Sequence, residues 1–445
     1  MTPRPAVRHV IPARLGEPRF DSPLRLDAEP GRGRGRFVPD GARIRHVVEV
    51  DTDCPLREEL LFEKAGPRRR IFFDPAHTRV AIVTCGGLCP GINSVIRSLF
   101  LELNFHYGVQ EVLGLRNGYR GLNPAAGLPP IVLTRGFVSE IHKEGGTMLG
   151  TSRGQQDVGV MVDFLEQQRI DVLFCVGGDG THRGAHAISE EIGRRRRPIA
   201  VVGVPKTIDN DIDYCDWTFG YLTAVDVARG VIHLAHTEAR STARGVGLVK
   251  LMGRYSGYIA CMATRASQEV NFVLIPEAPF ELHGEDGFLA ALERRIDDRD
   301  HAVVVVAEGA GQHLFETDDS TSVDASGNLR LHDIGQRLRQ EILDYFAVRG
   351  CPVDLKYIDP SYIIRSVPPT TADQLLCDDL ARRAVHAAMS GRTDMMISAL
   401  NHAFIHVPIS MVCVGRRQVD LESELWSSVL AATGQPPRFT ATPCP

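Results

Sequence analysis

Six short apolar runs constrain the fold of this chain more than any other feature of its sequence. They are rich in β-branched residues: RVAIVT (79–84), VLFCVGG (172–178), IAVVGV (199–204), GVGLVKL (245–251), VNFVLIP (270–276) and AVVVVAEG (302–309). Because each run is continuously hydrophobic rather than alternating, we expect strands buried on both faces, as in parallel sheets covered by helices. The sequence therefore predicts the α/β class.

Helix-patterned segments lie where crossover connections between such strands should be. GINSVIRSLFLELNFHY follows the first run, VGVMVDFLEQQR precedes the second, and GAHAISEEIGRRRR follows it. Since 445 residues are too many for one small core, we expect two packed units. Residues 315–330 (FETDDSTSVDASGNLR) predict a polar surface excursion, and residues 431–445 (AATGQPPRFTATPCP) predict a loose tail.

Composition excludes several classes of function. The net charge of −5 argues against a nucleic-acid partner, which would require a basic excess. No apolar run approaches the roughly 20 residues of a membrane helix. Only Cys85 and Cys89 form a close pair among ten cysteines, and no histidine at metal-ligand spacing accompanies them, so we expect reduced thiols in a cytoplasmic protein.

The amino-terminal residues form an arginine-rich extension. Eight arginines lie within the first 36 residues, but four acidic residues argue against a transit peptide: Glu17, Asp21, Asp27 and Glu29. We expect a poorly ordered or loosely docked extension.

Two glycine-rich segments could bind phosphate. TCGGLCPG (84–91) leads from a strand into a helix that should begin near Ile92, and such a turn brings backbone N–H groups close to an anion. A simple tight turn is the alternative. In GGTMLGTSRGQQD (145–157), Arg153 could bridge two phosphates, or it could be an ordinary surface arginine.

A third glycine-rich segment, CVGGDGTHRGA (175–185), surrounds a single carboxylate. A carboxylate beside a phosphate site repels the anion unless a cation lies between them, so Asp179 is a candidate magnesium ligand. Thr181 should open the next helix. Several nucleotide-using kinase families have this motif, and the chain has no GxxxxGK[ST] segment, which excludes the P-loop fold.

Acidic residues directly follow the strand-like run in AVVGVPKTIDNDIDYCD (200–216). A carboxylate held close to a substrate hydroxyl can accept its proton during transfer to phosphorus. One of Asp209 and Asp211 could do this, and the other would orient it or help to hold a cation. Alone, this segment could equally be a solvated loop, but beside the glycine-rich segments it predicts catalysis.

A final group of charged residues could hold a sugar phosphate. It lies in LMGRYSG (251–257), AEGAG (307–311) and KYIDPSYIIRS (356–366), with these candidates: Arg254, Glu308, Lys356, Tyr362 and Arg365. Sequence spacing alone does not bring them together.

In this order, the segments resemble the 6-phosphofructokinase family from about Gly66 to Met411. The matching stretches are GGLCPG (86–91), GGTMLGTSRG (145–154), GGDGT (177–181), PKTIDND (205–211), MGRYSG (252–257), AEGAG (307–311) and YIIR (362–365). AGPRRRIFFDP (65–75) is similar to the long-chain plant branch. The resemblance implies two Rossmann-like, three-layer αβα domains with mostly parallel sheets and an active site in the cleft between them.

The resemblance also implies an activity and a domain plan. ATP, with Mg²⁺, would phosphorylate the 1-hydroxyl of fructose 6-phosphate to give fructose 1,6-bisphosphate in glycolysis, in a cytoplasmic homodimer or homotetramer. The expected parts are an extension (1–70, partly disordered), an ATP-binding domain (71–220 with about 366–411), a fructose 6-phosphate-binding domain (221–365) and a carboxyl-terminal segment and tail (412–445).

The family's functional residues carry over position by position. Asp209 would be the base, assisted by Arg254, Thr207 and Asp211, and Asp179 the magnesium ligand. The nucleotide phosphates would contact Gly87, Arg153, Gly154, Gly178, Gly180 and Thr181. The sugar phosphate would contact Thr207, Ile208, Asp209, Met252, Gly253, Arg254, Glu308, Tyr362 and Arg365.

Two positions depart from the family pattern. Short bacterial members have an arginine from a neighbouring subunit at the position of Gly245, with Arg244 one place away here. Lys356 replaces another substrate-binding arginine, which keeps the charge but loses the bidentate fork.

Gly180 and Lys206 concern the phosphoryl donor. Pyrophosphate users resemble one another in having aspartate at the position of Gly180 and lysine at that of Lys206, whereas common ATP users have glycine at both. An aspartate would obstruct and repel the α-phosphate of ATP, so Gly180 predicts ATP, and pyrophosphate is the alternative. Two rival functions remain: a kinase that acts on NAD or a lipid headgroup, and a non-catalytic nucleotide sensor.

Overall fold

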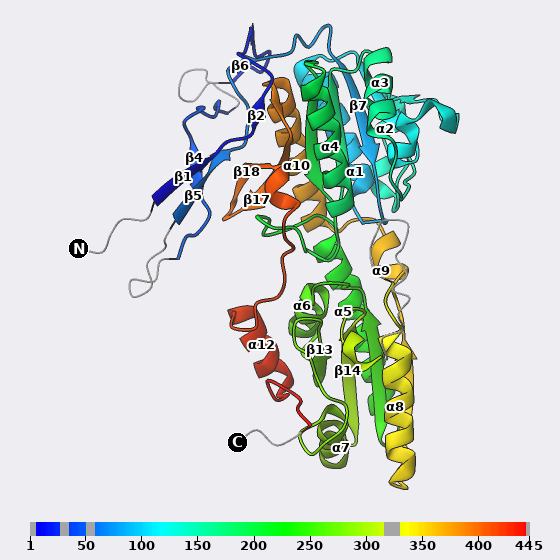
Figure 1. The fold of residues 1–445 in the computed structure, drawn as a ribbon. Helices are drawn as coiled ribbons and strands as arrows, with labels where there is room; N and C mark the ends of the chain where they lie inside the picture. Colours follow the sequence, from blue (N-terminus) through cyan, green and yellow to red (C-terminus); the bar gives the residue numbers. More distant parts are fainter. Residues whose placement is uncertain (1–5, 27–34, 50–57, 316–329, 442–445) are drawn as a thin grey trace, which may run out of the picture. The chain divides into compact units, whose positions relative to one another are not determined.

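The computed structural model describes residues 6–26, 35–49, 58–315 and 330–441, which form two compact units (Figure 1). Unit 1 contains the chain up to Thr207 together with Ile212–Gly220 and Val367–Gly415. Unit 2 contains Tyr221–Ser366, the segment from Arg416 onward, and the four residues Ile208–Asp211. No helix in these described ranges is long and apolar enough to cross a membrane.

Unit 1 is built on a large, mostly parallel sheet. Among the described residues its strand order is β1-β5-β18-β17-β11-β10-β7-β8-β9, with β4 also paired to β5. The parallel centre consists of β17 (Met395–Leu400), β11 (Ala200–Pro205), β10 (Val172–Gly177), β7 (Arg79–Thr84) and β8 (Glu111–Leu115). The antiparallel strands β18 (Ala403–Pro408) and β9 (Ile131–Val132) flank this centre.

Helices cover both faces of this sheet. α1 (Ile92–Leu101) packs with α10 (Thr371–Met389), while α3 (Val158–Gln167) packs with α4 (Asp179–Arg194). Apolar side chains of α3 and α4 share a core cluster with alternate residues of β7, β8, β10 and β11, which explains why those strands are apolar on both faces.

Unit 2 repeats this construction on a smaller scale. Its sheet is wholly parallel in the order β13-β14-β12-β15, with bounds Phe272–Leu274, His301–Ala307, Gly245–Leu251 and Asp354–Ile358. α7 (Phe288–Arg299) and α8 (Ile334–Val348) contribute to its core cluster, and α5 (Tyr221–Arg240) and α6 (Tyr258–Ser267) also pack on the sheet. The α/β prediction is confirmed, and the strands over 79–84 and 245–251 match the predicted runs residue for residue.

The amino-terminal extension is not loosely docked in the residues that the structure describes. β1 (Ala6–Val10) pairs with β5 (Glu58–Lys64), β4 (Arg43–Arg45) pairs with β5, and β5 pairs with β18. The predicted loose arrangement is therefore wrong for these strands.

An ion cluster around Glu63 explains why β5 belongs to the sheet. Glu63 is 0% exposed, and its carboxylate pairs with Arg68 at 3.1 Å, with Arg14 at 3.3 Å and with Arg392. Because the partners come from distant parts of the sequence, no local pattern announces the cluster. Burial raises the pKa of Glu63, but the hydrogen bond and charge of His406, together with the charges of Arg392 and Arg68, hold that pKa well below its usual range.

Replacing Glu63 with glutamine should destabilise unit 1 by about 3–5 kcal/mol, because two buried arginines lose a charged partner. Chemical unfolding by urea would measure the loss. Glu59→Gln is a matched control on the same strand, since Glu59 pairs with Arg45, which is 67% exposed, and such pairs contribute less than about 1 kcal/mol. Equal stability of the two variants would contradict the expected role of the cluster.

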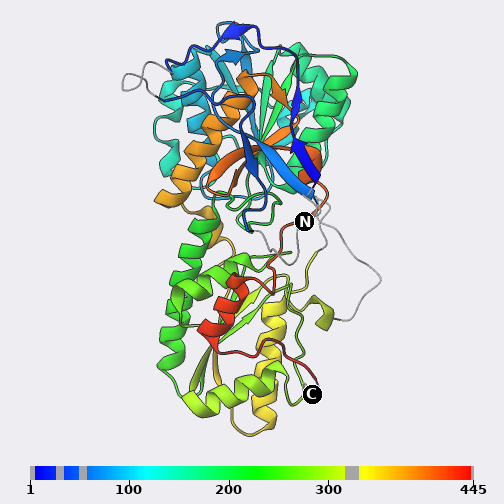
Figure 2. The same cartoon turned by 90° about the vertical axis from the view of Figure 1, so that its left-hand side faces the viewer.

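The described part of the carboxyl-terminal tail, residues 431–441, is also packed, contrary to the sequence prediction. Gln435 and Phe439 are 7% and 5% exposed, and the Gln435 amide bonds both the N–H and the carbonyl of Val273. The phenyl ring of Phe439 contacts those of Phe272 and Phe288. α12 (Glu424–Thr433) packs on α6, as Figure 2 shows. Most of the predicted surface excursion, residues 316–329, lies outside the described residues.

Candidate functional site

The first two glycine-rich segments lie together at the carboxyl ends of the strands of unit 1. Thr151 donates its hydroxyl to the Gly86 carbonyl at 2.6 Å, and the Gly86 N–H donates to the Ser152 carbonyl at 3.1 Å. The Thr84 hydroxyl donates to the Gly150 carbonyl at 2.8 Å. These bonds fix the segment around Gly87 beside the one that carries Arg153 and Gly154, both of which are exposed. As predicted, α1 begins at Ile92.

Lys206 connects the strand β11 to the first glycine-rich segment. Its side chain is buried, and Nζ donates to the Gly87 carbonyl at 2.8 Å. A buried ammonium at this position places a positive charge beside backbone that could contact an anion.

The third glycine-rich segment joins β10 to α4. Gly178 is the N-cap and the helix begins at Asp179, two residues before the predicted start at Thr181. A Cβ atom at Gly177 would lie 2.1 Å from the Thr181 hydroxyl, so packing within the chain requires that glycine. A Cβ atom at Gly180 would meet nothing within 4 Å, so the described chain supplies no packing reason for glycine there.

Asp179 presents one carboxylate beside these loops. It pairs with Arg183 one turn along α4 at 2.8 Å, with side chains 19% and 49% exposed. Among the described residues, no group of three or more His, Cys, Asp or Glu side chains could hold a metal ion. The donor set therefore fits Mg²⁺ only in its usual nucleotide-bound form, in which one or two carboxylates and the phosphates of the substrate share the ion.

In unit 2 the candidate site residues lie on the loops after β12 and β14, again at the carboxyl ends of the strands. Leu251 pairs with Ala307 at the ends of the two strands, which sets the segment from Met252 beside Glu308. A Cβ atom at Gly309 would lie 1.9 Å from the Arg254 carbonyl oxygen, and the Gly309 N–H donates to the Gly253 carbonyl at 3.1 Å. This close backbone approach explains the first glycine of AEGAG, Gly309.

Asp209 belongs to unit 2, although it follows a strand of unit 1. The Ser256 hydroxyl donates to the Asp209 carbonyl at 2.7 Å, and the Arg254 backbone donates to its carboxylate. Burial raises the pKa of Asp209 well above its ordinary value, and the neighbouring carboxylates of Asp211 and Glu308 raise it further. The structure thus brings Asp209, Arg254 and Glu308 together.

Other residues of the acidic segment 200–216 have structural partners. Ile208 is 5% exposed, and the Thr207 carbonyl accepts a bond from the Thr218 hydroxyl at 2.7 Å. The Asp211 carbonyl accepts the backbone N–H of Arg417 at 3.0 Å.

Arg365 joins the charges around Glu308. Burial raises the pKa of Glu308, and the positive charges of Arg254, Lys250 and Arg365 oppose that rise. The Arg365 guanidinium lies 4.9 Å from the ring centre of Tyr362, which is 75% exposed. Arg365 and Arg254 therefore both lie within electrostatic range of the Glu308 carboxylate.

Lys356 and Arg244 lie away from this group. Lys356 is opposite Gly247 in the strand register, before the carboxyl end of the sheet, and its ion pair is with Asp354 at 2.9 Å. Arg244 is at the amino end of β12, where it pairs with Asp297 at 2.9 Å. The contribution of Lys356 to substrate binding stays a prediction.

Sequence reasoning missed Lys250. Its ammonium lies 2.8 Å from Asp359 and 3.1 Å from Asp333, and its side chain is 12% exposed. The available signal was a single charged residue in the otherwise apolar run GVGLVKL.

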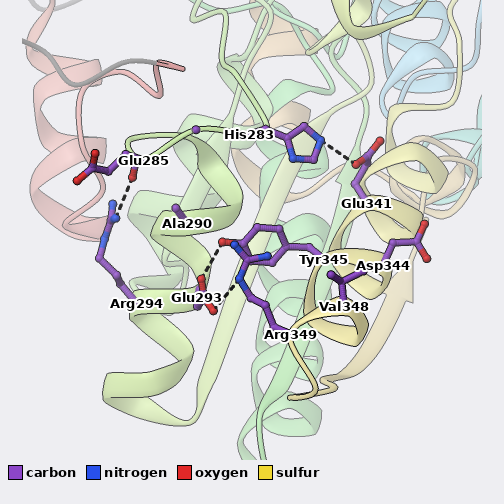
Figure 3. A pocket seen from close by; sticks show the side chains of 11 residues that line it. His283, Glu285, Ala290, Glu293, Arg294, Glu341, Asp344, Tyr345, Val348 and Arg349 are labelled. Carbon is purple, nitrogen blue, oxygen red and sulfur yellow. Dashed lines mark hydrogen bonds and ion pairs between the residues drawn. The ribbon is translucent and has the colours of Figure 1, made fainter.

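Unit 2 also has a pocket of about 670 Å³ between α7 and α8 (Figure 3). Its polar side chains pair mainly with one another: Glu293 accepts from Tyr345 at 2.7 Å and pairs with Arg349 at 3.1 Å. None of its lining residues belongs to the predicted site.

The chain is similar to known proteins over most of its length. A family model described as Phosphofructokinase matches residues 79–388. An ATP-dependent 6-phosphofructokinase of Borreliella burgdorferi is 46% identical over 95% of this chain and 96% of that protein. ATP-dependent 6-phosphofructokinase 7 of Arabidopsis thaliana is 44% identical over 97% of this chain and 88% of its own length.

A solved structure has the same fold. The crystal structure of a pyrophosphate-dependent phosphofructokinase from Marinobacter aquaeolei superposes with a TM-score of 0.67, at 19% identity, over 80% of this chain and 91% of that one. The glycine-rich loops, the acidic segment beside Arg254 and the extent of the sequence match lead to one conclusion: the chain belongs to the phosphofructokinase family.

Proposed function

We propose that this chain is an ATP-dependent 6-phosphofructokinase, which transfers the terminal phosphoryl group of ATP to the 1-hydroxyl of fructose 6-phosphate. The observation that carries the proposal is the grouping of Asp209, Arg254 and Glu308 in one unit, with Arg365 nearby. A general base and cations for a sugar phosphate are what this reaction requires. The names of the relatives at 44–46% identity support the same activity.

In this mechanism Asp209 accepts the proton of the 1-hydroxyl as the bond to phosphorus forms. Its raised pKa suits this task, because a base whose pKa lies nearer to neutrality takes up a proton more readily than an ordinary aspartate. Arg254 stabilises the negative charge that develops on the transferred group. In this proposal Glu308 accepts hydrogen bonds from sugar hydroxyls, and Arg254 and Arg365 bind the 6-phosphate.

The glycine-rich loops of unit 1 bind the phosphates of the donor in this proposal. Its contacts are the side chains of Arg153 and Lys206 and the backbone around Gly87, Gly154, Gly178 and Thr181. Asp179 would hold Mg²⁺ together with the phosphates, and the ion would supply positive charge that reduces repulsion of the attacking oxygen. Of these residues Thr181 is 4% exposed, so its contribution would be made largely by its backbone.

Removing Mg²⁺ is expected to stop the reaction. With excess EDTA, ADP release in the presence of fructose 6-phosphate should fall to background, because without a divalent cation the Asp179 carboxylate would repel the phosphates of the donor. Titration with MgCl₂ beyond the chelator should restore the rate. Activity that persists in excess EDTA would remove Asp179 from the mechanism.

Initial rates with ATP and with pyrophosphate, side by side on fructose 6-phosphate, test the proposed donor. Faster turnover with pyrophosphate would favour a pyrophosphate-dependent fructose 6-phosphate 1-phosphotransferase, which the name of the structural neighbour suggests as the second candidate. The same assay with NAD or a lipid as acceptor tests the rival kinase functions.

The proposed compartment is the cytoplasm. The described cysteines are all free thiols, and most of them are buried, which is usual for a protein kept in a reducing environment.

A further inference from the structure

We propose that Lys250 is a positioning residue of the sugar-phosphate site, which holds the segment carrying Tyr362 and Arg365 against the end of β12. The inference rests on the proposed function, because it concerns how that site binds fructose 6-phosphate. Lys250 is one residue before Leu251, the last residue of β12, and four before Arg254.

The first contact of Lys250 fixes the segment after β15. Its ammonium lies 2.8 Å from the Asp359 carboxylate, which also accepts the Ser361 N–H at 3.1 Å. The turn then continues into α9 (Ile363–Ser366), where the Ile363 N–H donates to the Pro360 carbonyl at 2.8 Å. The ion pair therefore anchors the turn from which Tyr362 and Arg365 project.

The second contact fixes the start of α8. Asp333 lies 3.1 Å from the Lys250 ammonium, and it is also the N-cap that accepts the N–H groups of Gly335 and Gln336. A single cation thus connects β12, the turn after β15 and the amino end of α8.

A second bridge connects the loop after β14 to the segment just before α8. The Gln312 amide donates to the Glu308 carbonyl and to the His332 carbonyl, each at 3.2 Å, and it accepts the His332 N–H at 3.0 Å. His332 is the residue before Asp333. Gln312 therefore ties the backbone of Glu308 to the segment just before α8, and Lys250 ties β12 to the N-cap of the same helix.

Lys250 is suited to positioning rather than to direct contact with substrate. Two carboxylates already share its ammonium, and its side chain is 12% exposed. A neutral side chain at this position would leave the Asp333 and Asp359 carboxylates without their shared cation beside Glu308. Their mutual repulsion would displace the turn that carries Arg365.

The test compares Lys250→Met with the wild type in the ATP assay on fructose 6-phosphate. We expect KM for fructose 6-phosphate to rise about tenfold or more, while kcat and KM for ATP change less than about threefold, because the lost contacts support binding of the sugar phosphate alone. Lys250→Arg keeps the charge and can bond both carboxylates, so it should recover most of the affinity. Arg337→Met removes the α8 pair with Glu341 and should change none of these constants.

The outcomes separate this inference from the proposed function. A wild-type protein that phosphorylates fructose 6-phosphate with neither donor would refute the function. An active wild type beside a Lys250→Met variant with an unchanged KM, or with kcat and both KM values worsened together, would overturn the inference. If thermal unfolding shows that Lys250→Met does not fold, Asp359→Asn should give the same selective rise in KM, and an unchanged KM in that variant would also overturn it.

Discussion

Replacing Asp209 with asparagine should lower kcat by at least about 10²-fold, because asparagine keeps the shape of the side chain and cannot accept the proton of the 1-hydroxyl. KM for fructose 6-phosphate should change little, since the amide oxygen can still accept the bond from the Arg254 backbone. Steady-state assays of ADP release at saturating substrates would measure both constants. Asp297→Asn is the matched control, because Asp297 pairs with Arg244 at the opposite end of β12.

The pH profile gives a second readout of the same prediction. The base must be ionised to act, so kcat/KM should fall as the pH drops through the pKa of Asp209. Because burial, Asp211 and Glu308 raise that pKa, the fall should begin at a higher pH than an ordinary aspartate would give. The asparagine variant should lack this acid limb. Near-normal turnover of the variant would show that Asp209 is not the base.

Replacing Gly180 with aspartate should abolish the use of ATP while sparing or creating the use of pyrophosphate. Position 180 is the second residue of α4, and its new side chain would enter open space. It would add a negative charge next to Asp179, where the α-phosphate of ATP would pass. Pyrophosphate has no such phosphate. Parallel initial rates with the two donors would measure the change.

Gly193→Asp is a matched control for this variant. Gly193 lies near the other end of the same helix, and a Cβ atom there also meets nothing within 4 Å. It should leave the ATP rate unchanged, so a general effect of aspartate on α4 is distinguishable from the effect at the phosphate loop. Retention of ATP activity by Gly180→Asp would show that donor choice depends on other residues.

Local signals explain which parts of this molecule could be predicted from its sequence. The strands β7 and β12 are continuous apolar runs, and glycine-rich or acidic segments follow them, so the elements and their loops could be placed on pattern alone. The sequence also placed Arg254 and Glu308 in one site only through the family resemblance. The grouping itself depends on the pairing of Leu251 with Ala307, which spacing does not reveal.

The parts that could not be predicted depend on contacts between distant residues. β5 (EELLFEK) is rich in charge, and it is a sheet strand because Glu63 meets Arg68 and Arg392 in a buried cluster. The carboxyl-terminal segment has a tail-like composition, yet Gln435 takes the place of a neighbouring strand at Val273. Lys250 likewise acquires its role from Asp333 and Asp359, which are more than 80 residues away along the chain.

The division of the chain between the two units has a practical consequence for recombinant work. The backbone changes unit after Thr207, Asp211, Gly220, Ser366 and Gly415, so neither unit corresponds to one uninterrupted stretch. A hybrid that exchanges only residues 221–366 between two relatives would keep the recipient's own residues 208–211 and its own segment from Arg416 onward, although both belong to unit 2. Gene fragments intended to transplant sugar selectivity should therefore include residues 208–211 and the segment from Arg416 onward.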